Sequence, residues 1–141
     1  MNVIRNILNP KSALPIMLWL LAILVLFHIS IILKIIPYDI TWGGILKNDT
    51  DMYLFEGISI LMTLCLFFIL LIKGRYIPDL ISPKIVNGLL WGFLFLFGMN
   101  TITNIFAETT FEKYFALLTV TFSYLIWVIL KQDRIRTQHQ P

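Results

Sequence analysis

Residues Leu14–Ile36 read LPIMLWLLAILVLFHISIILKII, a run of 23 residues in which only His28, Ser30 and Lys34 are clearly polar. An α-helix of this length rises about 1.5 Å per residue and is long enough to cross a hydrocarbon core about 30 Å thick. The run is longer than the apolar part of a signal peptide, which spans about 7–15 residues. We therefore expect it to remain in the protein as a membrane-spanning helix.

Three further apolar runs follow, at Met52–Ile72, Ile85–Phe106 and Tyr114–Leu130. Lipid offers the backbone no hydrogen-bond partner, so each run must satisfy its own amides as a helix. The composition agrees, because 58% of the residues are hydrophobic and 13% charged, against about 45–50% and about 25% in soluble domains. The sequence predicts an all-α membrane protein, an antiparallel four-helix transmembrane bundle that occupies residues 1–141 as one domain.

Lysine and arginine are unequally shared between the two sides of this predicted bundle. Eight lie on the side of the termini, at Arg5, Lys11, Lys73, Arg75, Lys84, Lys131, Arg134 and Arg136. Three lie on the other side, at Lys34, Lys47 and Lys113. By the positive-inside rule both termini are expected to be cytoplasmic. The net charge of +3 then reflects topology, and we expect no nucleic-acid partner.

The sequence lacks the residues of most common catalytic and metal sites. Cys65 is the single cysteine, which excludes a disulfide within the chain and a cysteine zinc site. His28 and His139 lie far apart, and no phosphate-binding glycine loop or serine-nucleophile motif occurs. We therefore expect no cofactor and no metal. The Ile-, Asn- and Lys-containing composition is typical of bacteria with AT-rich genomes, so we expect a multi-pass protein of a bacterial inner membrane.

Polar residues within the predicted spans gather in their outer halves, whereas the inner halves are almost purely apolar. Asn100, Asn104 and Glu108 follow i, i+4, i+8 and lie on one helix face. Polar groups that face lipid are costly, so these side chains should face inward and form a cup open to the outside. The candidate ligand-binding residues are Lys34, Tyr38, Asp39, Trp42, Tyr53, Glu56, Asn100, Asn104 and Glu108.

Each of these residues also has a purely structural interpretation. His28 is as typical of helix packing as of function, Lys34 lies near enough to the boundary to reach water, and the asparagines are typical of contacts between helices. Gly88 and Gly92 have the spacing that allows two helices to pack closely. These polar residues lie at a similar depth in the predicted membrane. This common depth favours a ligand-binding site more strongly than any single residue does.

The connection 37–51 reads PYDITWGGILKNDTD and is long for a four-helix membrane protein. Asp39 and Trp42 lie within it, and Gly43–Gly44 would provide a hinge. We interpret this connection as a lid over the cup.

Two segments carry a family resemblance. IPYDITWGG…LKNDTDMYLFE at Ile36–Glu56 and NTITNIFAETTFEKYF at Asn100–Phe115 resemble segments of small four-span inner-membrane proteins of bacteria. This resemblance implies a fold and no catalytic activity. The plan of four spans with acids and a histidine near one face is also similar to that of the sterol-isomerase and sigma-2-like group, without a matching motif.

Three functions fit these residues. The first is a membrane protein that binds an amphipathic or lipid-like molecule, with a hydrophobic body or a cationic head, or a partner helix, in the cup. The second is an isomerase-like enzyme that transfers protons on a hydrophobic substrate, with His28 and Glu56 as the catalytic acid–base pair. The third is a homodimeric, proton-coupled transporter. A structural subunit that packs in the membrane through Gly88 and Gly92 is the simplest alternative.

The predicted orientation is testable with reporter fusions. Green fluorescent protein fused behind the C-terminus should fluoresce, and alkaline phosphatase at the same position should be inactive, because the eight basic residues keep this end in the cytoplasm. The opposite pair of results would place the polar cup on the cytoplasmic side.

Overall fold

The computed structural model describes residues 10–42, 46–107 and 110–138, and this part of the chain is helical apart from its connections. Its long helices are α2 (Pro10–Ile32), α3 (Asp49–Lys73), α4 (Pro83–Ile105) and α5 (Thr110–Gln138), with the short 3-10 helix η1 (Tyr38–Ile40) between the first two. The segments long and apolar enough to cross a membrane are Ser12–Ile32, Asp49–Lys73, Pro83–Ile105 and Thr110–Lys131. The prediction of an all-α chain with four helices able to span a membrane is confirmed for the described residues.

The first helix has the length that the hydropathy of the sequence predicts, but it begins and ends four residues earlier. It ends at Ile32 rather than at Ile36. Lys34 has a φ of 58°, and the amides of Lys34 and Ile35 donate hydrogen bonds to the carbonyls of Ile31 and Ser30. Such a left-handed residue, with amides that bond back into the last turn, is a common helix C-terminus. Lys34 therefore lies beyond the helix and not inside the first span, where the sequence placed it.

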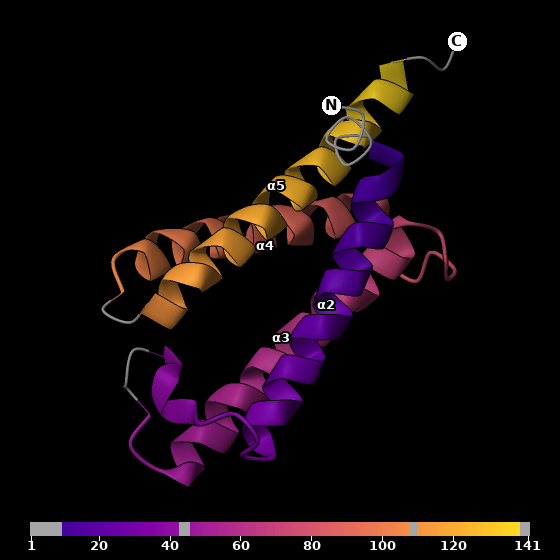
Figure 1. The fold of residues 1–141 in the computed structure, drawn as a ribbon. Coiled ribbons are helices and arrows are strands. Elements are labelled where there is room, and N and C mark those ends of the chain that lie inside the picture. The colour runs from indigo at the N-terminus through magenta and orange to yellow at the C-terminus, as the bar shows by residue number, and fades with distance from the viewer. Residues whose placement is uncertain (1–9, 43–45, 108–109, 139–141) are drawn as a thin grey trace.

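The four helices form two hairpins (Figure 1). In the first hairpin Lys34 Nζ lies 2.6 Å from Asp49 Oδ2, so the end of α2 is beside the start of α3. In the second hairpin the hydroxyls of Thr101 on α4 and Thr119 on α5 lie 2.9 Å apart. The hairpins meet near the start of α2 and diverge toward the opposite end (Figure 1). Their arrangement as one antiparallel bundle across a membrane, and the side on which the termini lie, stay predictions.

The main core lies where the two hairpins meet. All four helices contribute side chains with almost no exposed surface to this cluster, among them Met17, Leu21, Leu66, Leu70, Leu90, Phe122, Leu125 and Ile126. These residues come from the halves of the spans that the sequence predicts to be purely apolar. Without polar groups to accommodate, these halves pack closely, and the polar halves are the ones that diverge.

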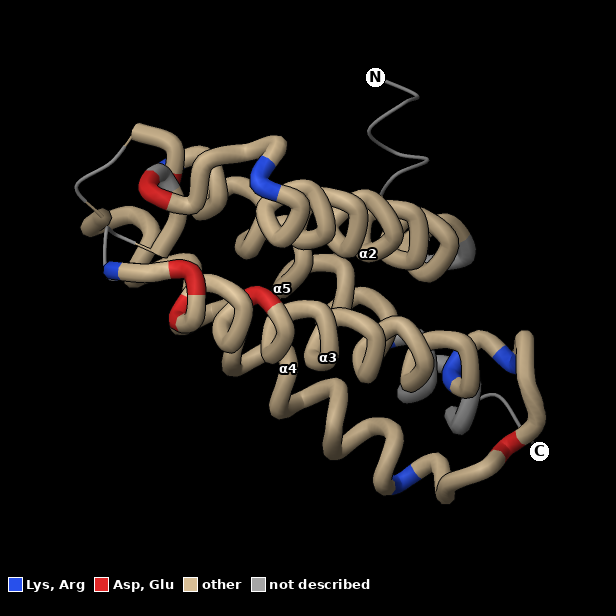
Figure 2. Tube along the Cα trace, turned by 90° about the horizontal axis from the view of Figure 1, so that it is seen from below, with Lys and Arg blue, Asp and Glu red and all other residues tan. Residues whose placement is uncertain are grey.

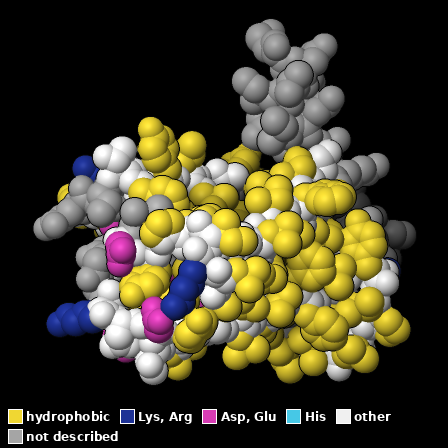
Figure 3. Space-filling model, turned by 60° about the horizontal axis from the view of Figure 1, so that its bottom comes forward, with side chains coloured by type: hydrophobic (Ala, Val, Ile, Leu, Met, Phe, Trp, Pro, Cys, Tyr) yellow, Lys and Arg dark blue, Asp and Glu magenta, His cyan; other side chains and the backbone are white. Residues whose placement is uncertain are grey.

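The outer surface of the helices is broadly apolar (Figure 3). Trp19 is 73% exposed and Phe95 69% exposed, as expected where lipid replaces water. Acidic residues gather at the end with the connection between α2 and α3 (Figure 2). The expected close packing at Gly88 and Gly92 does not occur within the described chain, because no neighbouring atom lies within 4 Å of where a Cβ would stand.

The core predicts a contrast between two leucines of α2. Leu21 is 0% exposed, whereas Leu26 is 63% exposed. Leu21→Ala should lower the free energy of unfolding in mixed micelles by about 2–4 kcal/mol because it leaves a cavity. Leu26→Ala should lower it by less than about 1 kcal/mol. Equal losses would mean that the two hairpins do not meet at Leu21.

Candidate ligand-binding site

The carboxyl group of Glu56 is buried in the part of the described chain where the two hairpins diverge (Figure 1). Glu56 lies on α3 and is 0% exposed. Its Oε2 lies 2.6 Å from Nδ1 of His28 on α2, and its Oε1 accepts a hydrogen bond of 2.9 Å from the indole Nε1–H of Trp42. Both oxygens therefore have a partner, as a buried carboxyl requires.

Trp42 reaches this position because the connection after α2 turns back toward α3. Its φ of 57° is unusual for a bulky residue, and the preceding Thr41 is held by a hydroxyl hydrogen bond to the carbonyl of Tyr38. The indole packs on Phe55, with ring centroids 5.0 Å apart. This part of the predicted lid is therefore attached to α3. The predicted hinge at Gly43–Gly44 lies outside the described residues.

Leu46 attaches the same connection at a second place. It is 5% exposed and forms a small apolar cluster with Ile31 of α2 and Met52 of α3. Tyr38 packs against this cluster from outside. The connection is therefore held against the first hairpin on both sides of the residues that the structure leaves undescribed.

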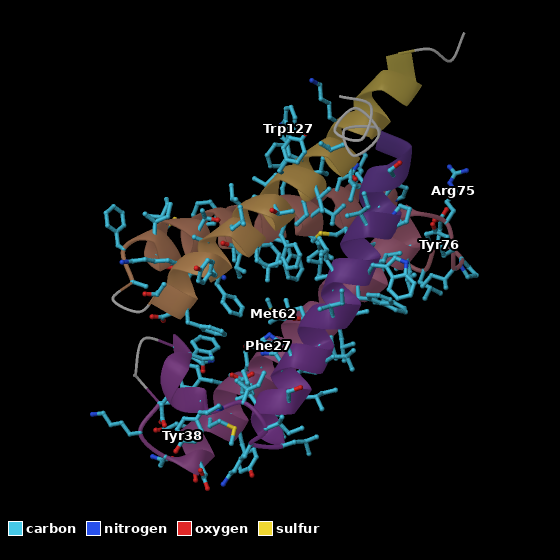
Figure 4. All side chains as sticks on the ribbon, in the orientation of Figure 1. Phe27, Tyr38, Met62, Arg75, Tyr76 and Trp127 are labelled. Atoms are coloured by element: carbon cyan, nitrogen blue, oxygen red, sulfur yellow. The ribbon has the colours of Figure 1, made fainter. Side chains whose placement is uncertain are left out.

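A cavity of about 740 Å³ lies between the diverging ends of the two hairpins. Trp42 and the His28–Glu56 pair line it from the first hairpin and its connection, and Asn100, Asn104 and Glu112 line it from the second. Figure 4 shows Phe27 and Met62 in the space between the hairpins, whereas Trp127 points away from it. The arrangement resembles the cup that the sequence predicts, with its polar groups on opposite walls.

The rest of the cavity wall is rich in aromatic rings. Phe27 of α2 lies 6.1 Å from Phe111 and 5.2 Å from Phe115 of α5, measured between ring centroids. Phe27 thus connects the two hairpins across the cavity. Deeper in the molecule, Phe97 and Phe122 pack edge to face at 5.0 Å and also line the cavity. A hydrophobic molecule would meet rings on several sides.

The hydroxyl groups of the cavity wall donate to backbone carbonyls of their own helices. Ser59 donates to Phe55 at 2.9 Å, and Thr63 donates to Ser59 at 2.7 Å. Thr103 donates to the carbonyl of Asn100. These hydroxyls therefore have hydrogen-bond partners within their own helices, as serine and threonine commonly do in helices, and they give no specific indication of a ligand.

Several candidate residues lie apart from the cavity lining. Lys34 and Asp49 form an exposed ion pair, and the hydrogen bond from Lys34 to Asp49 raises the pKa of Lys34 above its ordinary value. The other described candidates that do not line the cavity are Tyr38, Asp39 and Tyr53. Glu108 lies outside the described residues. Of the nine candidate ligand-binding residues, the structure brings Trp42, Glu56, Asn100 and Asn104 together around one space.

Sequence reasoning missed the apolar stripe that α5 contributes to this wall. Phe111, Phe115, Leu118 and Phe122 all line the cavity and follow i, i+4, i+7, i+11, which is the spacing of one helix face. This signal is visible in the sequence, but an apolar stripe on a membrane helix looks the same whether it faces lipid, a core or a cavity. Glu112 of α5 also lines the cavity.

The contact between His28 and Glu56 determines the chemistry of the cavity. Nδ1 and Oε2 lie 2.6 Å apart, within hydrogen-bond distance, and which of the two donates depends on the tautomer of the imidazole. The pair could exchange a proton with a bound molecule through the imidazole ring. Among the described residues no group of three or more His, Cys, Asp or Glu side chains is placed to hold a metal ion.

Comparison of the chain with protein-family models, curated proteins and solved structures finds no match. The function is therefore argued from the geometry of the cavity.

The hydrogen bonds of Glu56 predict a graded loss of stability. Glu56→Leu leaves His28 and Trp42 without their partner and should lower the free energy of unfolding by about 2–4 kcal/mol. Trp42→Phe removes one hydrogen bond and should cost about 1–2 kcal/mol. The control is Tyr53→Phe on α3, because this side chain is 48% exposed and should change stability by less than about 0.5 kcal/mol. If Glu56→Leu left the free energy of unfolding unchanged, this result would contradict the contacts described above.

Proposed function

We propose that this chain is a small integral membrane protein that binds an amphipathic or lipid-like molecule in the cavity between its two hairpins. The observation that carries the proposal is the cavity of about 740 Å³, with aromatic walls and a few polar groups. Small-molecule sites in proteins have volumes of about 300–1,000 Å³ and the same mixture of apolar walls and a few placed polar groups. A partner helix is the other occupant that the outer cup would accept.

The proposal includes an orientation in the membrane. The four helices form an antiparallel bundle with both termini in the cytoplasm of a bacterium and the cavity in the outer leaflet of the inner membrane. The unequal distribution of lysine and arginine supports this orientation. The gathering of acidic residues at the end with the cavity supports it as well (Figure 2).

Proton transfer on a hydrophobic substrate is the second candidate function. The 2.6 Å contact between His28 and Glu56 favours it, since both residues line the cavity. Such an enzyme would use the imidazole to move a proton between two positions of the substrate and the carboxyl group to hold or return it. This candidate predicts a chemical change in the bound molecule, whereas a binding protein leaves the molecule unaltered.

Filling the cavity should remove the ligand. Met62 lines the cavity, and its neighbour Leu61 is 68% exposed and does not line it. Met62→Trp should lower the amount of lipid-like molecule that copurifies with the protein, measured by mass spectrometry, by about tenfold or more. Leu61→Trp is the matched control and should leave this amount unchanged. Equal retention in both variants would overturn the binding proposal.

The same experiment separates binding from catalysis when Glu56→Gln is included. A binding protein should hold the same compound in the wild type and in the variant. An enzyme should yield substrate in the variant and a mixture with its double-bond isomer in the wild type. A mixture only in the wild type would favour the second candidate.

A further inference from the structure

The acidic groups of the cavity already have partners within the protein. Glu56 is 0% exposed, and its two oxygens are taken by His28 and Trp42. Glu112 also interacts with another residue of the chain. A cationic head group could reach the Glu56 carboxylate only by displacing one of its two donors, which costs about 1–3 kcal/mol for the group left unpaired. The cavity is therefore poorly suited to a cation.

The imidazole of His28 presents a hydrogen-bond donor to the cavity. Its Nδ1 is used by Glu56, its Nε2 has no partner among the described residues, and the side chain is 12% exposed. In a neutral pair Nε2 carries a hydrogen, whether the shared proton is on Nδ1 of an imidazolium or on the Glu56 carboxyl.

The opposite wall supplies two further donors. Asn100 and Asn104 lie one turn apart on α4 and both line the cavity. Their side-chain amides have no hydrogen-bond partner in the described part of the chain. Each NH₂ group can donate two hydrogen bonds, and an amide left without a partner in a membrane is costly. Donors from both hairpins therefore face the same space.

The charges of the cavity also disfavour an anionic ligand. No lysine or arginine is among the described residues that line it. Lys34, just beyond the end of α2, is paired with Asp49 and exposed. An anion would therefore enter the cavity with no counter-ion and with two acids in its walls, and a neutral head group avoids this cost.

We propose that the bound molecule is a neutral lipid whose head group presents carbonyl oxygens to the donors of the cavity wall, which are His28 of one hairpin and Asn100 and Asn104 of the other. This inference rests on the proposed binding function. The apolar body of the lipid lies against Phe27, Phe111 and Phe115, which line the cavity from both hairpins. Carbonyl oxygens of this kind occur in neutral acyl esters and in membrane quinones.

Trp42 provides a local measurement because it lines the cavity. The full-length protein carries Trp19→Phe, Trp91→Phe and Trp127→Phe, so that all fluorescence comes from Trp42. It is placed in lipid nanodiscs and titrated with probes that share one brominated chain, which quenches indole fluorescence, and differ in the head group. The heads are a methyl ester, a carboxylate and a trimethylammonium group. Each probe concentration counts only the probe molecules that are bound to the membrane.

We expect the methyl ester to quench Trp42 saturably, with an affinity at least about fivefold higher than that of either charged probe, which corresponds to one hydrogen bond. Asn104→Leu and Asn100→Leu should each weaken the ester by a similar factor and leave the charged probes unchanged. Met99→Leu is the matched control, because Met99 is 46% exposed and does not line the cavity. A quinone with the same chain, compared with the ester, identifies which source of the carbonyl binds more tightly.

The two proposals fail in different ways. Tighter saturable binding of the ammonium or carboxylate probe would overturn the carbonyl inference and leave the binding function standing. Unchanged ester binding in both asparagine variants would also overturn it. No saturable quenching by any probe would overturn the binding function itself.

Discussion

The burial of one carboxyl group is the constraint on which the half of the molecule with the diverging hairpins depends. Glu56 has no exposed surface, and its oxygens are held by His28 of α2 and Trp42 of the connection. An unpaired carboxyl in this environment would cost several kcal/mol. The helix hairpin and its connection must therefore adopt a geometry that brings both donors to α3. This requirement explains why a tryptophan occupies a left-handed backbone conformation with a φ of 57°.

The cavity follows from the uneven polarity of the four helices. Where their faces are almost purely apolar, side chains such as Met17, Leu21 and Leu70 pack together with no exposed surface. Toward the other end the facing residues include a carboxyl group that bonds an imidazole, and two amides that have no side-chain partner in the described chain. The hairpins diverge there (Figure 1), and aromatic rings such as Phe27 and Phe115 maintain contact across the gap. Packing at one end and polarity at the other thus produce a pocket.

The polar groups that line the cavity differ in how completely the protein satisfies them. Hydroxyls such as Thr63 bond their own helix, and Glu56 is satisfied by two other elements. The amides of Asn100 and Asn104 have no side-chain partner in the described chain. In a membrane the unsatisfied groups are the ones that favour a ligand, because they gain most from a new hydrogen bond. Recognition in this cavity is therefore a question of which groups remain available rather than which are charged.

Sequence alone determined the number and type of the helices and their approximate bounds, because hydropathy and the length needed to cross lipid are local properties of the chain. It also placed the polar residues in the outer halves, and Asn100 and Asn104 on one face. Only the tertiary structure decided that α2 ends before Lys34 and that Glu56 bonds residues 28 and 14 positions away. Those pairings depend on how the hairpin and its connection pack, which no local pattern of residues encodes.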